Sequence, residues 1–171
     1  MRLVSGKIPV IAQEITATLC ADGDIEVLVE EKGEVELDLS AVLKEYIRTE
    51  RELVDQARDI LARENLDFGS LSKVKRRLAE SRNFGIGEDA IEYLVQQIIE
   101  VLLHSRHVEE VYADDNTLRR KMSESLRKHM ALDNELDQEV RRRIKNLQEG
   151  STTWEVDYQR VMEELRRTHR K

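Results

Sequence analysis

Three acidic side chains near the start of the chain, Asp22, Asp24 and Glu26, have the spacing with which a calcium-binding loop begins. Such a loop needs glycine at its sixth position, where the backbone turns sharply, and a bidentate glutamate at its twelfth. Here those positions hold Val27 and Gly33. The pattern therefore favours a solvated acidic segment over a calcium site.

A second group with metal-ligand character is His104 and His107, with Glu100 one helical turn before His104. No further histidine or cysteine completes a four-ligand set, and imidazoles at the end of a helix also interact favourably with its last carbonyls. Cys20 has no histidine equivalent in its own half of the chain and stands in an apolar helical pattern. We therefore expect a packed thiol, no resident metal or cofactor, and no catalytic residue.

The glycines of Gly85-Ile86-Gly87 precede a helical pattern, as in loops that cradle phosphate. Glu88 and Asp89 follow directly. Their carboxylates would repel a phosphate at the position where helix amides would hold it. We interpret the segment as a flexible joint and helix cap.

Basic residues stand in short runs within helical patterns. The candidate basic surface consists of Lys73, Lys75, Arg76, Arg77, Arg119, Arg120, Lys121, Arg141, Arg142 and Arg143. On helices these runs could converge into one surface that binds nucleic acid. The alternative, which we favour, is that each run is a solvated helix face or pairs with acids one turn away.

The net charge of the 171-residue chain is −7. Residues 22–38 contain eight acids against Lys32 alone, so this segment accounts for all seven charges and the rest is neutral. Such a field opposes general binding to polyanions. Aromatic residues are only 4% of the chain, which argues against stacking platforms and most small-molecule pockets.

Several features predict a cytoplasmic location with no membrane contact. The chain has one cysteine, and its first residues, MRLVSGKIP, lack the apolar core of a signal peptide. The longest apolar cluster, around Ile98 to Leu103, is far too short to span a bilayer.

An internal repeat organises the sequence. Residues 40–61 return in weaker form as residues 123–144, an offset of 83 residues without a gap. The identical pairs include Ser40 and Ser123, Leu43 and Leu126, Glu52 and Glu135, Leu53 and Leu136, Arg58 and Arg141, and, upstream, Gln13 and Gln96. We therefore predict two tandem related helical units, residues 1–83 and 84–171, packed as one compact body.

The apolar spacing predicts a mainly α protein, a helical bundle. We expect helices at about residues 9–22, 38–61, 71–80, 88–104, 117–147 and 154–167. Near residues 25–38 apolar and acidic residues alternate, which indicates a small acidic β-hairpin, with an extended loop as an equal alternative and a helix as a third.

Several strings of the chain together resemble a bacterial family, domain-of-unknown-function family five-zero-seven. They are MRLVSGKIP, VLKEYIRTERELVDQA, FGIGEDAIEYLVQQIIEVLL, HVEEVYADD with LRRKM, and EVRRRIKNLQEGSTTWEVDYQRVM. The resemblance covers nearly the whole chain. It implies a bacterial cytosolic protein and transfers no catalytic residue.

The function that these patterns favour is a non-enzymatic helical interaction or structural module that self-associates or binds a protein partner. The alternative is a nucleic-acid-associated regulatory protein that uses basic helix faces. An enzyme is third, because no spacing predicts convergent carboxylates or histidines, and no small-molecule ligand is evident.

Overall fold

The computed structural model describes residues 2–145 and 152–169. These residues form a mainly α protein, as predicted. Its α-helices are α1 (Ile8–Ala21), α2 (Lys32–Arg63), α3 (Leu71–Ser81), α4 (Ala90–His104), α5 (Asp115–Arg143) and α6 (Thr152–His169). Two short strands are β1 (Ile25–Glu26) and β2 (Glu110–Val111), and single 3-10 turns are Ser5–Lys7, Val29–Glu31, Phe68–Ser70 and Gly87–Asp89.

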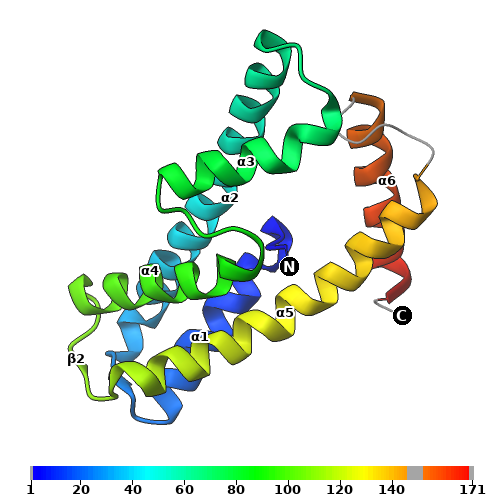
Figure 1. The fold of residues 1–171 in the computed structure, drawn as a ribbon. Helices are drawn as coiled ribbons and strands as arrows, with labels where there is room; N and C mark the ends of the chain where they lie inside the picture. The colour runs from blue at the N-terminus through cyan, green and yellow to red at the C-terminus, as the bar shows by residue number, and fades with distance from the viewer. Residues whose placement is uncertain (1, 146–151, 170–171) are drawn as a thin grey trace.

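The main core lies among α1, α4 and the first halves of α2 and α5 (Figure 1). Each helix contributes the residues that recur every third or fourth position in the sequence, because these share one face of a helix. The most apolar helix, α4, packs against both α2 and α5. It buries Ala90, Ile91, Leu94, Val95, Ile98, Ile99 and Leu102.

Two helical arms extend from this core and diverge (Figure 1). Arm 1 is residues 54–81, the last ten residues of α2 with α3, and arm 2 is the described part of residues 136–169, the end of α5 with α6. Each arm has its own small apolar cluster. Arm 1 buries Ala57, Leu61 and Val74; arm 2 buries Leu136, Val140, Ile144, Tyr158, Val161, Met162 and Leu165.

The acidic segment near residues 25–38 adopts two of the expected conformations in succession. Ile25–Glu26 is a strand, but it pairs antiparallel with Glu110–Val111 and not with the residues that follow it. From Lys32 the chain is helical. Val35 and Leu39 are fully buried whereas Leu37 is 61% exposed, which is the consequence of helical rather than alternating geometry.

The long helices differ from their expected bounds at both ends. α2 begins at Lys32 instead of about Asp38. α5 begins at Asp115, where the Asp114 carboxylate accepts a hydrogen bond of 2.7 Å from the Thr117 amide and caps the helix. It ends at Arg143 instead of Leu147: Ile144 and Lys145 are not helical, and Leu147 lies outside the described residues.

The glycine segment before α4 is packed and is not a loose joint. Phe84 is buried, and the Tyr46 hydroxyl donates a hydrogen bond of 3.0 Å to the Gly85 carbonyl. A Cβ at Gly85 would lie 2.6 Å from the Asp89 carbonyl oxygen and from Tyr93 Cβ. Glycine is therefore required here because the backbone passes so close to the first turn of α4.

The order of elements repeats along the chain. A 3-10 turn, a helix, a short strand, a long helix and a shorter helix occur twice. The long helices begin at Lys32 and Asp115, which are 83 residues apart like the repeated sequences. α1 packs against both α2 and α5, and α4 does the same, so helices from both halves of the chain build the one core.

Candidate interaction site between the arms

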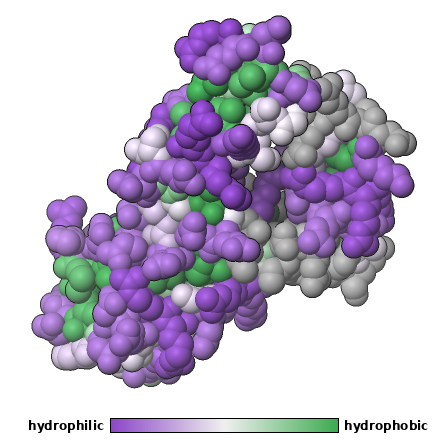
Figure 2. Space-filling view, viewed as in Figure 1, coloured by the Kyte–Doolittle hydropathy of each residue, from purple (hydrophilic) through white to green (hydrophobic). Residues whose placement is uncertain are grey.

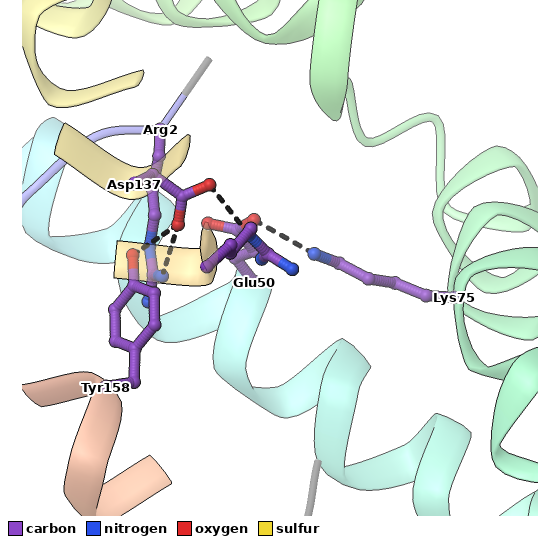
Figure 3. A network of polar contacts seen from close by, with 6 residues as sticks. Arg2, Glu50, Lys75, Asp137 and Tyr158 are labelled. Carbon is purple, nitrogen blue, oxygen red and sulfur yellow. Dashed lines mark hydrogen bonds and ion pairs between the residues drawn. The ribbon is translucent and has the colours of Figure 1, made fainter. Parts of the chain in front are cut away.

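A network of polar contacts lies where the two arms leave the core (Figure 3). We define the inter-arm network as Arg2, Glu50, Lys75, Asp137, Arg141, Trp154 and Tyr158. On the arm 1 side, Lys75 of α3 donates to Glu50 of α2 over 3.0 Å. Their side chains are 22% and 28% exposed, so this pair is partly shielded from water.

On the arm 2 side the network centres on Asp137 of α5, whose side chain is 14% exposed. Arg141 approaches it at 2.8 Å and Arg2 at 3.7 Å, and the Tyr158 hydroxyl donates to the same carboxylate. Burial raises the pKa of Tyr158, and the hydrogen bond to Asp137 raises it further. The phenol therefore stays protonated and acts as a donor.

Aromatic rings extend this side of the network. Trp154 stacks on Tyr158 with ring centroids 4.9 Å apart. The guanidinium of Arg141 lies 5.4 Å from the Trp154 ring, and that of Arg2 lies 4.9 Å from the Tyr158 ring. Cations over ring faces attract the π electrons, so the α6 rings and two arginines form one connected stack.

The charged and aromatic groups of the inter-arm network are engaged by one another. The carboxylates of Glu50 and Asp137 contact cations, and the ring faces contact arginines. Within the described residues, no three metal-ligating side chains gather into a group that could hold an ion.

The ten predicted basic residues occupy three separate places. At the start of α5, Arg119 pairs with Asp115 and Arg120 with Glu124. Lys121 in the next position reaches Asp22 at 2.7 Å and also contacts Asp24. Lys121 therefore links the acidic segment to α5, whereas Arg119 and Arg120 pair with acids of α5 itself, and the three do not form one open surface.

The second basic run, at the end of α5, is also paired. Arg141 contacts Asp137, while Arg142 and Arg143 both contact Glu139. This run is 22 residues from Arg119, which corresponds to about 33 Å along a helix. The two α5 runs therefore cannot form one compact surface.

The third run is on α3, and three of its members differ from the rest. Lys75 belongs to the inter-arm network, but Lys73, Arg76 and Arg77 are exposed. Within the part of the chain that the structure describes, no ion pair to any of these three is found. They occupy the α3 face opposite buried Val74 and Ala79.

The histidine and cysteine candidates have structural surroundings. His104 Nδ1 lies 2.7 Å from the Glu100 carbonyl oxygen, as expected at the end of a helix, and His107 pairs with Glu31. Cys20 packs half-buried against the main core near the end of α1. Burial raises the pKa of this thiol, and the charge of Lys32 acts in the opposite direction.

Sequence reasoning missed a partly buried hydrogen-bonded group between α1 and α5. Glu14 accepts hydrogen bonds from His129 over 2.7 Å and from Ser125 over 3.1 Å, and Lys128 lies 3.4 Å away. Its members stand more than 110 residues apart, so no local spacing could show it. One signal was available in the sequence: His129 stands at the position that corresponds to Tyr46 in the first half of the chain.

Comparison with family models gives a match over residues 1–170 to the model described as "Protein of unknown function (DUF507)". The chain belongs to the DUF507 family. This confirms the resemblance drawn from the five sequence strings. A search of curated proteins found no match for the DUF507 chain.

Membership in DUF507 places the fold described above within a family and assigns no role to any residue. Among the described residues of this DUF507 protein, no helix has both the length and the apolar character needed to cross a bilayer. The function has to be argued from the geometry of this chain.

Proposed function

We propose that the protein is a non-enzymatic helical interaction module that acts in the bacterial cytoplasm and binds a protein partner or a second copy of itself. The observation that supports this proposal is the pair of arms on one shared core. Their apolar clusters are separate in the described residues, and the groups between them are polar. The arms can therefore move relative to each other when a partner binds, because that movement would expose little buried apolar surface to water.

The same proposal includes the duplication of the chain. The repeated order of elements and the equal spacing of the long helices support descent of residues 1–83 and 84–171 from one helical unit. Because α1 packs on α5 and α4 packs on α2, each unit supplies part of the surface that the other covers. The units would then share one core while their arms remain free to diverge in sequence.

A photo-crosslinking amino acid in place of Lys75, within the inter-arm network, tests the proposal in native cells. We expect a discrete protein adduct after illumination. The matched control is the same amino acid in place of Arg120, which is exposed near the start of α5 and far from the arms. Illumination that gives no protein adduct at position 75, or equal adducts at both positions, would contradict a partner between the arms.

A second candidate function, nucleic-acid binding, is supported by the three unpaired cations of α3. Phosphate contacts from Lys73, Arg76 and Arg77 would give binding that weakens steeply as salt rises. If the parent protein binds mixed DNA or RNA at low salt, changing these three to Gln should weaken binding and flatten its salt dependence. Changing Arg141, Arg142 and Arg143 to Gln is the control, because their charges are already paired. A parent protein that binds neither polymer removes this candidate.

A further inference from the structure

One end of the molecule presents exposed acids and apolar side chains together. We define the acidic end by exposed residues of the small sheet and the turns beside it: Glu26, Leu28, Val29, Glu30, Glu109, Glu110 and Tyr112. Val29 is 80% exposed and Tyr112 is 65% exposed. Figure 2 shows apolar side chains between hydrophilic ones at the lower left, over the end of α4 and the region of β2. The exposed cation of the neighbouring loop is Arg106.

The charges of the acidic end are arranged unfavourably in the isolated molecule. Glu26 and Glu110 are direct cross-strand partners, and Glu109 donates its backbone amide to the Glu26 carbonyl over 2.8 Å. Like charges directly opposite in an antiparallel pair destabilise it. The Tyr112 hydroxyl donates to Glu26 over 2.7 Å and offsets part of this repulsion. Cations placed over this end would offset the rest.

The opposite end of α2 has the complementary composition. We define the basic tip as Arg63, Leu66, Phe68, Lys73, Arg76 and Arg77, around the turn between α2 and α3. Leu66 is 42% exposed and Phe68 is 43% exposed. In the described part of the chain, none of the four basic residues has an ion-pair partner. They outnumber the two exposed acids of the same turn, Glu64 and Asp67.

We infer that the basic tip docks on the acidic end of a second copy of the chain. This inference goes beyond the proposed function, because it assigns self-association to two surfaces outside the inter-arm network. Each surface combines exposed apolar side chains with charges of one sign, and the two signs are opposite. Apolar contact supplies the affinity, and charge complementarity sets the orientation and the rate of encounter.

The position of the two surfaces fixes the type of assembly. α2 has 32 residues and so is about 48 Å long, with the acidic end at its start and the basic tip beyond its end (Figure 1). One copy can therefore contact a neighbour through each surface. A head-to-tail contact of this kind gives open chains or rings, which grow with protein concentration. Among the described residues of arm 2, the positions that correspond to Lys73, Arg76 and Arg77 hold Val156, Gln159 and Arg160, and Arg160 is paired with Asp157.

Sedimentation velocity of the full chain and of charge-reversed variants tests this inference. The tip variant carries Lys73→Glu, Arg76→Glu and Arg77→Glu. The end variant carries Glu30→Lys, Glu109→Lys and Glu110→Lys. The control variant carries Glu92→Lys, Glu163→Lys and Glu164→Lys, which reverses exposed acids elsewhere. Circular dichroism establishes that each variant keeps the helical content of the parent.

At low ionic strength we expect the parent and the control variant to form species larger than a dimer, which dissociate as salt is raised to about 0.5 M. Each charge-reversed variant alone should sediment as a monomer, because its tip and its end carry the same sign. Mixed in equal amounts, the two variants should assemble again, since every contact then joins opposite signs.

Three outcomes would overturn the inference: a parent that is monomeric at every concentration, a mixture that stays monomeric, or a control variant that dissociates like the other two. If the parent protein is monomeric and its basic tip binds nucleic acid, then the α3 cations bind nucleic acid and not a second copy of the chain. If the parent protein is monomeric and still gives the protein adduct at position 75, self-association is rejected and the proposed function stands.

Discussion

At the scale of single residues, two positions 83 residues apart in the chain differ in their chemistry. Tyr46 is buried among rings, 4.9 Å from Phe84 and 6.0 Å from Tyr93 between centroids. The corresponding residue in the second half, His129, is 9% exposed and pairs with Glu14. Both side chains tie a long helix to a segment of the opposite half. The two positions therefore contact the opposite half of the chain by different means, through rings at Tyr46 and through a carboxylate at His129.

Replacement of Glu14 by Gln should make stability less dependent on acid pH. Burial alone would raise the pKa of Glu14, but hydrogen bonds from His129 and Ser125 and the charge of His129 lower it below 4.5 overall. A lowered folded-state pKa stabilises the protein above the unfolded value, and this stability is lost as pH falls through the lowered pKa. We expect Glu14→Gln to cost about 1 kcal/mol at neutral pH.

The measurement for Glu14→Gln is chemical denaturation at a series of pH values. The difference in the free energy of unfolding between variant and parent should shrink as the pH falls below 4.5, the ordinary pKa of a glutamate. Glu163→Gln is the control, because the exposed ion pair of Glu163 with Arg167 contributes little to the free energy of unfolding. A difference that stays constant at all pH values would show that the charge of Glu14 is not involved.

A pair of glycine substitutions tests the close approach before α4. Gly85→Ala would place a Cβ 2.6 Å from the Asp89 carbonyl oxygen and should destabilise the protein by about 1–3 kcal/mol. Gly33→Ala meets open space in the first turn of α2 and should stabilise it by up to about 1 kcal/mol. Thermal unfolding checks both. Equal melting temperatures for the two variants would refute this account of the segment.

At the scale of elements, the sequence predicts the helices well because their apolar residues recur with helical spacing. Most residues that α2 and α4 bury are apolar and recur every third or fourth position, such as Leu39, Leu43 and Tyr46 of α2. The sequence places the start of α2 too late because Val35, Leu37 and Leu39 alternate with acidic residues, a pattern that also predicts a strand. Packing decides between these patterns: Val35 and Leu39 enter the core and Leu37 does not.

Substitutions on the two long helices test which face of each is buried. Leu43 and Leu126 are fully buried, so Leu43→Asp and Leu126→Asp should each cost at least about 3 kcal/mol by burying an unpaired charge. Leu37→Asp on α2 is the matched control, because that side chain is 61% exposed. Thermal melts decide the outcome. A melting temperature for either core variant close to that of Leu37→Asp would mean that its helix faces another way.

Long-range partners could not be predicted from the sequence, for a physical reason. The register of β1 with β2, the hold of Lys121 on the acidic segment and the Glu14–His129 pair all join residues about 85 to 115 apart. Spacing reports only which residues share a face of one element. Whether a basic run is open or paired depends on the neighbouring element, so the exposed cations of α3 emerged only from the three-dimensional structure.

At the scale of the whole molecule, the core belongs to both halves of the chain. α1 and the first half of α2 come from the first half, α4 and the first half of α5 from the second, and their buried residues form one apolar cluster. Separation of the halves would expose the apolar faces between α1 and α5 and between α4 and α2. That exposure is unfavourable in proportion to the apolar area returned to water.

Fragments 1–83 and 84–171 should therefore be poorly folded alone and should form a helical complex when mixed. Circular dichroism of each fragment and of the mixture measures this directly, with the sum of the separate spectra as the reference. Helicity in the mixture should exceed that sum. Two fragments that are stable monomers and do not interact would mean that the halves are independent domains.

Cys20, the only cysteine, makes this protein suited to single-site chemical labelling without any introduced residue. The raised pKa leaves little thiolate at neutral pH, and packing against the core limits access for a reagent. Alkylation should therefore be slow in the folded protein and fast once the end of α1 separates from its neighbours. The rate of alkylation would then report how often the end of α1 unfolds locally next to the acidic end. A dye attached to Cys20 would occupy one known position in every molecule.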